Sequence, residues 1–130
     1  MTDIVGTWRL VRAVARNADG KELPVPYGGQ GLGRIVFGAD GRMAVMMIDG
    51  RKDMPAGEKR EYGGYCGTYT YDGEQLITHV DSAPDASRIG SDQTRGVRFE
   101  GGLMVLRPPP RGQGDTMEQR ELSWEKISSV

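Results

Sequence analysis

His79 is the only histidine in the chain, and Asp81 follows it two positions later. The ordinary pKa of a histidine side chain, about 6.5, suits it to proton transfer near neutral pH. We therefore predict a catalytic pair in which His79 moves a proton and Asp81 orients the imidazole. The alternative is an interior histidine that a neighbouring tyrosine or aspartate holds for structural reasons. A nucleophilic Cys–His pair would need Cys66, whose side chain strand alternation places on the outer face.

Arg95 and Arg120 form a second candidate group, because each shares a strand face with large apolar residues. Arg95 alternates with Val97 and Phe99, and Arg120 alternates with Leu122. Side chains two positions apart point to the same face of a strand, so both guanidiniums are predicted to face the interior. A buried guanidinium is costly unless it meets an anion, so we predict a clamp for a carboxylate, enolate or phenolate. The alternative is that both arginines reach the rim and pair with surface carboxylates.

Other side chains are predicted to line the same interior. The tyrosines of the strand that starts near position 65 could donate hydrogen bonds there, or they could simply pack in the core. The full set of predicted ligand-binding residues is Arg95, Arg120, Tyr69, Gln93, Tyr65, Met47, Trp124 and Phe37.

We expect neither a metal nor a cofactor. One histidine with scattered carboxylates is a poor ligand set for a metal ion. The stretch "YGGQGLGR" (27–34) lacks the spacing of a phosphate-binding loop and precedes a strand instead of opening a helix.

These candidates fall on short apolar runs separated by turn dipeptides. Asp40-Gly41, Asp72-Gly73 and Gly101-Gly102 each lie between two such runs, which is typical of hairpins. Eight runs result, and closing an eight-stranded meander on itself removes its exposed edges. We predict an all-β fold: an eight-stranded antiparallel up-and-down barrel with at most a short helix in residues 50–64. Residues 1–130 would form one domain, whose interior could hold one small ligand.

Strand alternation leaves one strand undecided and settles the face of another. In the strand that contains His79, either Leu76, Thr78 and Val80 face the interior, or Ile77, His79 and Asp81 do. In the first strand, alternation predicts one shared face for Trp8, Leu10 and Val14.

Composition and charge limit the partners. The formal net charge is −1, so no basic surface indicates nucleic acid or an anionic membrane. The stretch "MTDIVGTW" at the N-terminus shows no signal sequence, so we expect a cytoplasmic protein. The runs "MAVMMI" and "LMVL" are apolar on both faces, so something should cover them on the outside. The 50–64 segment and a second subunit of a homodimer are the two candidate covers.

The chain resembles the bacterial and fungal lipocalin-like domain proteins. The matching stretches are "GTWRL" (6–10), "GRIVFGADGRMAV" (33–45), "YCGTYTYDGEQLITHVDSAP" (65–84), "QTRGVRFEGGLMVLRPPP" (93–110) and "ELSWEKI" (121–127). The resemblance implies a lipocalin-type barrel with an interior pocket that His79 and Arg95 face, and this implication favours the inward placement of Ile77, His79 and Asp81. The chain departs from the family pattern in "DASRIG" (85–90), where relatives tend to carry an aromatic residue, and in a short 50–64 segment.

The functional expectation is a small-molecule-binding barrel that holds a mostly apolar ligand with an anionic, enol or phenol group. The alternative is a cofactor-independent isomerase, cyclase or lyase that acts on a polyketide-, terpenoid- or aromatic-like substrate in the same pocket. In that version His79 is the acid or base, and the arginines stabilise a developing oxyanion. A third alternative is a filled barrel that acts as a structural or interaction module.

Overall fold

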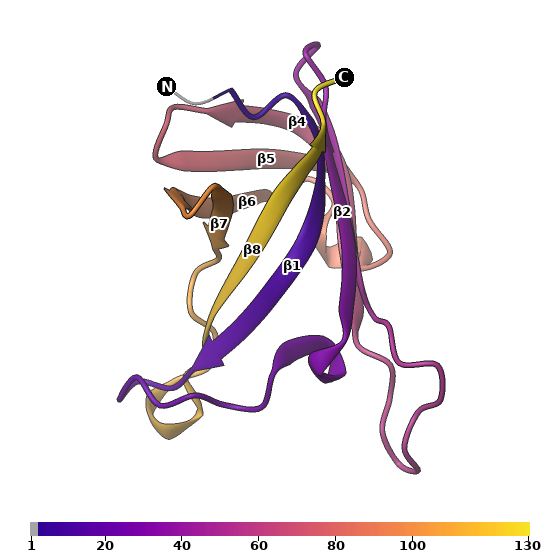
Figure 1. Cartoon of the computed structure of the whole chain (residues 1–130), viewed down its shortest axis with the longest axis vertical. Coiled ribbons are helices and arrows are strands. Elements are labelled where there is room, and N and C mark those ends of the chain that lie inside the picture. Colours follow the sequence, from indigo (N-terminus) through magenta and orange to yellow (C-terminus); the bar gives the residue numbers. More distant parts are fainter. Residues whose placement is uncertain (1–2) are drawn as a thin grey trace.

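The computed structural model describes residues 3–130, and in this part of the chain eight antiparallel strands close into a barrel (Figure 1). Each strand pairs with its neighbours in the sequence, and β8 pairs with β1. The predicted eight-stranded up-and-down barrel is confirmed. The strands are β1 (Gly6–Arg16), β2 (Gly31–Phe37), β3 (Arg42–Asp49), β4 (Tyr62–Tyr71), β5 (Gln75–Ser82), β6 (Asp92–Glu100), β7 (Leu103–Arg107) and β8 (Gln119–Ser128).

The three predicted hairpins join β2 to β3, β4 to β5, and β6 to β7. The last is a two-residue turn in which Gly101 and Gly102 have φ values of 59° and 82°, the left-handed backbone that only glycine adopts without strain. Within residues 3–130, helical structure is limited to three short 3-10 turns: η1 (Pro26–Gly29), η2 (Ala86–Arg88) and η3 (Gly114–Thr116). The 50–64 segment, for which at most a short helix is predicted, contains none: its residues 50–61 include a turn in which the Glu58 N–H donates to the Pro55 carbonyl at 3.1 Å, and β4 begins at Tyr62.

Long and short connections lie at opposite ends of the barrel. The long connections are residues 17–30, 50–61, 83–91 and 108–118, and they follow β1, β3, β5 and β7. The short hairpins follow β2, β4 and β6. In Figure 1 the 38–41 hairpin stands at the upper end and the 50–61 connection hangs from the lower end. Because successive strands run in opposite directions, every long connection emerges at the same end.

The end with the short hairpins is sealed by core side chains. The Trp8 Nε1–H donates to the Ile4 carbonyl at 2.9 Å, and Ile4 is buried. The Phe37 and Tyr69 rings meet edge to face with centroids 5.0 Å apart. The Tyr69 hydroxyl donates to the Gly38 carbonyl at 2.8 Å. A ligand can therefore not enter from this end.

A β-bulge changes the alternation in β1. Trp8 and Leu10 face the core as predicted, but the pairing with β8 shifts between Leu10 and Arg12. The shift moves Ala13 into the core, while Val14 is only half-buried. The prediction that Val14 shares the face of Trp8 and Leu10 is wrong, because one extra residue inverts every later side chain of a strand.

The outer face of β2 and β3 remains open. Leu32, Val36 and Met46 are 57%, 45% and 52% exposed, so the 50–61 segment does not cover them. A second subunit as the cover stays a prediction. No helix within residues 3–130 has the length and apolar character needed to cross a membrane.

Candidate functional site

A cavity of about 270 Å³ occupies the half of the barrel that lies toward the long connections. Its inner wall is apolar and comes from strands, and its mouth is formed by residues of the long connections. The apolar wall residues include Ile35, Met43, Val45, Met47, Leu76, Leu106, Leu122 and Trp124, and the mouth residues include Tyr27, Glu61, Arg88, Pro108, Pro109 and Arg111.

Arg95 enters this cavity from β6 and has no carboxylate partner. Its Nη1 donates to the Thr94 carbonyl at 2.9 Å and its Nη2 approaches the Gln93 Oε1 at 3.5 Å. Among residues 3–130, no Asp or Glu oxygen lies within ion-pair distance of this guanidinium. Burial lowers the pKa of Arg95, because removal from water disfavours the charged form. An anionic ligand group would satisfy it.

Two guanidiniums lie near the Tyr65 ring. The Arg88 and Arg95 guanidinium carbons are 5.7 Å and 5.9 Å from the centre of its ring. Tyr65 is 5% exposed, and in the described part of the chain its hydroxyl has no hydrogen-bond partner within the protein. Arg88 likewise forms no ion pair with any described residue. This wall of the cavity therefore offers two free cations and one free hydroxyl.

Arg120, the predicted second half of the clamp, is already neutralised. Its Nη1 lies 2.9 Å from Glu61 Oε2 and its Nε lies 2.7 Å from Glu118 Oε1. The hydrogen bonds and charges of these carboxylates outweigh the lowering effect of burial, so the pKa of Arg120 is raised. Its side chain contacts the Tyr27 ring from outside the cavity, 5.6 Å from the ring centre. Arg88, and not Arg120, shares the cavity with Arg95.

Tyr27 and Glu61 form the part of the mouth that Arg120 supports. Tyr27 has a φ of 57° and is the one non-glycine residue of the described chain in the left-handed region. Such a residue needs support from its surroundings. The Tyr27 N–H donates to Glu61 Oε1 at 2.8 Å, and its hydroxyl lies 3.6 Å from Met47 Sδ. Burial and the charge of Glu61 raise the pKa of Tyr27, so its hydroxyl stays protonated.

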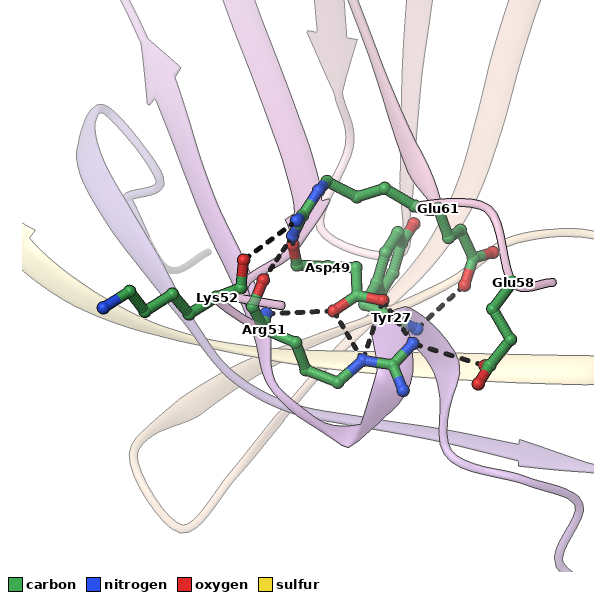
Figure 2. Close-up of polar contacts among 7 residues, drawn as sticks. Tyr27, Asp49, Arg51, Lys52, Glu58 and Glu61 are labelled. Carbon is green, nitrogen blue, oxygen red and sulfur yellow. Dashed lines mark hydrogen bonds and ion pairs between the residues drawn. The ribbon is translucent and has the colours of Figure 1, made fainter. Parts of the chain in front are cut away.

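A buried ion pair holds the 50–61 connection in place. Figure 2 shows the Asp49 carboxylate facing the Arg51 guanidinium, with contacts of 2.7–3.1 Å, and Glu58 beside the same guanidinium. Asp49 is 1% exposed, and hydrogen bonds from Arg51 lower its pKa. Arg60 donates to the Asp49 carbonyl at 2.7 Å. These contacts fix the segment that ends at Glu61.

His79 and Asp81 lie on the outer surface. The His79 side chain is 62% exposed and its Nδ1 lies 2.9 Å from Asp92 Oδ1, while Asp81 pairs with Arg42. Leu76, Thr78 and Val80 face inward and are 1%, 0% and 1% exposed. The prediction that Ile77, His79 and Asp81 face the interior is wrong. The chosen register buries two aliphatic side chains and leaves an imidazole and a carboxylate in water, which avoids burying a charge.

The other predicted binding residues divide into three groups. Phe37 and Tyr69 belong to the packed core at the closed end, and Arg120 lies behind the mouth. The residues that do line the cavity are Arg95, Gln93, Tyr65, Met47 and Trp124. Their role in binding stays a prediction.

Sequence reasoning missed the mouth residues Tyr27, Glu61, Arg88 and Arg111. All four lie in long connections, and these alternate with short hairpins along the chain. In an up-and-down barrel that alternation alone places every long connection at one end, so it was the signal that could have found them.

No cluster of three or more His, Cys, Asp or Glu side chains in residues 3–130 is arranged to hold a metal ion. In the comparisons with known proteins, a family model described as the lipocalin-like domain matches residues 5–127. Neither a curated protein nor a solved structure matches the chain.

Proposed function

Because this chain belongs to the lipocalin-like domain family and its barrel contains an arginine-lined cavity, we propose that it binds a small, mostly apolar molecule with one anionic group. The anionic group, a carboxylate, enolate or phenolate, contacts Arg95. The apolar part lies against the aliphatic and aromatic wall.

The observation that carries this proposal is the unpaired guanidinium of Arg95. Arginines removed from water are normally paired with a carboxylate, as Arg51 and Arg120 are in this same protein. Arg95 and Arg88 both lie near the Tyr65 ring without such a partner among the described residues. A charge-assisted hydrogen bond from an anion to this group would be stronger than a neutral one.

Binding of an aromatic carboxylate tests the proposal. We expect 2-naphthoate to bind, with quenching of tryptophan fluorescence because Trp124 lines the cavity. Arg95→Met should weaken binding of 2-naphthoate by about 10-fold or more, the worth of a hydrogen bond to a charged group. The neutral isostere 2-naphthamide should lose less than about 3-fold, since its uncharged carbonyl oxygen accepts only a weaker bond from the guanidinium.

Arg98→Met is the matched control. Arg98 lies on the same strand, but it points outward and pairs with Glu121 at 2.6 Å. It should leave both affinities unchanged. Equal loss of the acid and the amide in Arg95→Met would show that the arginine only shapes the wall, and the anionic part of the proposal would be abandoned.

A second candidate function is acid–base catalysis in the same cavity, as a cofactor-independent isomerase, cyclase or lyase. The observation that favours it is the free hydroxyl of Tyr65, whose ring lies near two guanidiniums. It could donate to an enolate oxygen while the cations stabilise the enolate charge and solvent water accepts the proton from carbon. Tyr65 thereby takes the place that the sequence assigned to His79. Exchange of the acidic C–H of benzoylacetone in D2O should be accelerated by the protein and slowed in Tyr65→Phe; absence of any acceleration would remove this candidate.

A further inference from the structure

Three hollows of the molecule meet at one point of the barrel wall. The interior cavity, a side hollow of about 210 Å³ and an outer groove of about 520 Å³ all border on Tyr62 and Gly63. The side hollow also shares Arg88 with the cavity, and the outer groove shares Tyr65 with it. The interior cavity and the outer groove therefore adjoin at this position, on the side of the mouth that Glu61 and Arg88 form.

The second and third residues of β4 are glycines, Gly63 and Gly64, so the barrel wall carries no side chains at these two positions. The Gly63 position faces inward, like Tyr65, and a Cβ placed on it would meet no atom of the described chain within 4 Å. The inward glycines of β2 differ: a Cβ on Gly33 would contact Leu10 and Trp124 at 3.1 Å. Space beside Gly63 is therefore not taken up by neighbouring side chains.

The neighbouring backbone leaves the same place uncovered. A Cβ on Gly64 would lie 2.5 Å from the Val45 carbonyl oxygen, so this position cannot carry a side chain that closes the wall. The pairing of β4 with β5 stops at Cys66 and Ser82, and residues 62–64 pair with β3 alone. Residues 62–64 thus form a free strand edge that faces the 83–91 connection.

The outer groove that begins at this edge has an apolar floor. Met46 is 52% exposed and Tyr62 is 66% exposed, and the groove continues over Ile48, Ala83 and Pro84. The free cations of the cavity lie close by, since Tyr65 is two residues along β4 from Gly63, or about 7 Å at the rise of a strand. The cations of the cavity suit the anionic head of an amphiphile, and the apolar floor of the groove suits its alkyl chain.

We infer that the lateral opening at Gly63 and Gly64 admits single-chain carboxylic acids longer than the cavity. The carboxylate contacts Arg95, and the alkyl chain leaves the barrel beside Gly63 to lie on Met46, Tyr62 and Pro84. The cavity of about 270 Å³ is below the usual size of a ligand pocket, so a longer ligand needs this second compartment. The inference rests on the proposed function, because the head group uses the same arginine.

Cys66 provides a direct readout on the unmodified protein. It is the only cysteine and it borders the outer groove but not the interior cavity. Dodecanoate, kept below its micelle concentration, should slow alkylation of Cys66 by N-ethylmaleimide by about 3-fold or more. Saturating 2-naphthoate, which fits within the barrel, should leave the rate unchanged.

A pair of surface variants tests the path of the chain. Met46 borders only the outer groove. Met46→Gln should lower the affinity for dodecanoate by about 3- to 10-fold, because each buried methylene is worth up to about 4-fold in affinity. It should leave 2-naphthoate unaffected. Val36→Gln, a similar change on the neighbouring strand outside the groove, should affect neither ligand.

Several results would overturn the inference while leaving the proposed function intact. Binding of 2-naphthoate through Arg95 without Cys66 protection by dodecanoate would confine ligands to the barrel. If Cys66 became protected at higher protein concentration without any ligand, the occupant of the groove would be a second copy of the chain. If phosphatidylcholine vesicles protected Cys66 as strongly as dodecanoate does, the outer groove would be a membrane contact. Failure of every carboxylate to bind would instead remove the proposed function itself.

Discussion

The Arg95 guanidinium lies 5.9 Å from the centre of the Tyr65 ring, inside the barrel, with no carboxylate of the described chain in ion-pair contact. In the same protein, Asp49 and Arg51 show what a satisfied pair looks like, with an Nη2–Oδ2 distance of 2.7 Å. On the proposed function, the anionic group of the ligand supplies the partner that Arg95 lacks, and the unpaired charge costs the free protein stability.

Arg95→Met should therefore stabilise the ligand-free protein, by about 1 kcal/mol or more, because a desolvated charge is replaced by an apolar side chain of similar length. Urea unfolding followed by tryptophan fluorescence would measure this. Arg98→Met should not stabilise, since it removes an exposed ion pair. A loss of stability in Arg95→Met would mean that the guanidinium is satisfied within the protein.

Thr78→Val should also stabilise, by about 1–2 kcal/mol. Thr78 is 0% exposed and its Oγ1 has no hydrogen-bond partner among the described residues, so valine keeps the shape and removes an unsatisfied polar atom. The exposed Thr68 on β4 supplies the control, because Thr68→Val should change the free energy of unfolding by less than about 0.5 kcal/mol. A destabilised Thr78→Val would point to a buried water on this hydroxyl.

His79→Ala should change little, although His79 is the residue that sequence alone singles out. Its side chain is 62% exposed, and exposed ion pairs such as that with Asp92 contribute about 0–1 kcal/mol. The affinity for 2-naphthoate should stay within about 2-fold of wild type by fluorescence titration. A 10-fold loss would restore His79 to the ligand site.

The Asp49 carboxylate should make the free energy of unfolding fall at low pH. Hydrogen bonds from Arg51 hold its pKa in the folded protein below the ordinary value of about 3.9. Because the pKa of Asp49 is lower in the folded protein than in the unfolded chain, its ionised carboxylate stabilises the fold. This stabilisation is fully present above the pKa of the unfolded chain, and it is lost as the pH falls through the pKa of the folded protein. Asp49→Asn should therefore lower the urea midpoint at pH 7, and its difference from wild type should shrink below about pH 4.

Glu58→Gln is the matched control for Asp49→Asn. Glu58 touches the same arginine at 3.5 Å, but it is 53% exposed. Its replacement should alter the midpoint little at either pH. A constant difference between Asp49→Asn and wild type across this range would show that the carboxylate contributes through its shape and not through its charge.

The turns and the apolar runs were sufficient to predict the barrel. Asp40-Gly41, Asp72-Gly73 and Gly101-Gly102 fix hairpins locally, because the backbone of such turns requires glycine. The apolar side chains of Val97 in β6 and of Leu122 and Trp124 in β8 predict which face of each strand points to the core. Arg95 was placed in the interior on the same ground.

The tertiary structure decided the features for which the local sequence pattern favoured neither alternative. The strand of His79 has apolar and polar members on both faces, so its parity depends on the register with β4 and β6. The neutralisation of Arg120 depends on Glu61, 59 residues away, and the free strand edge at Gly63 depends on where the pairing of β5 stops. Sequence determined the barrel and one inward arginine because alternation and turn chemistry are local. Which charges are paired, and where the wall is open, depends on contacts between segments far apart in the chain.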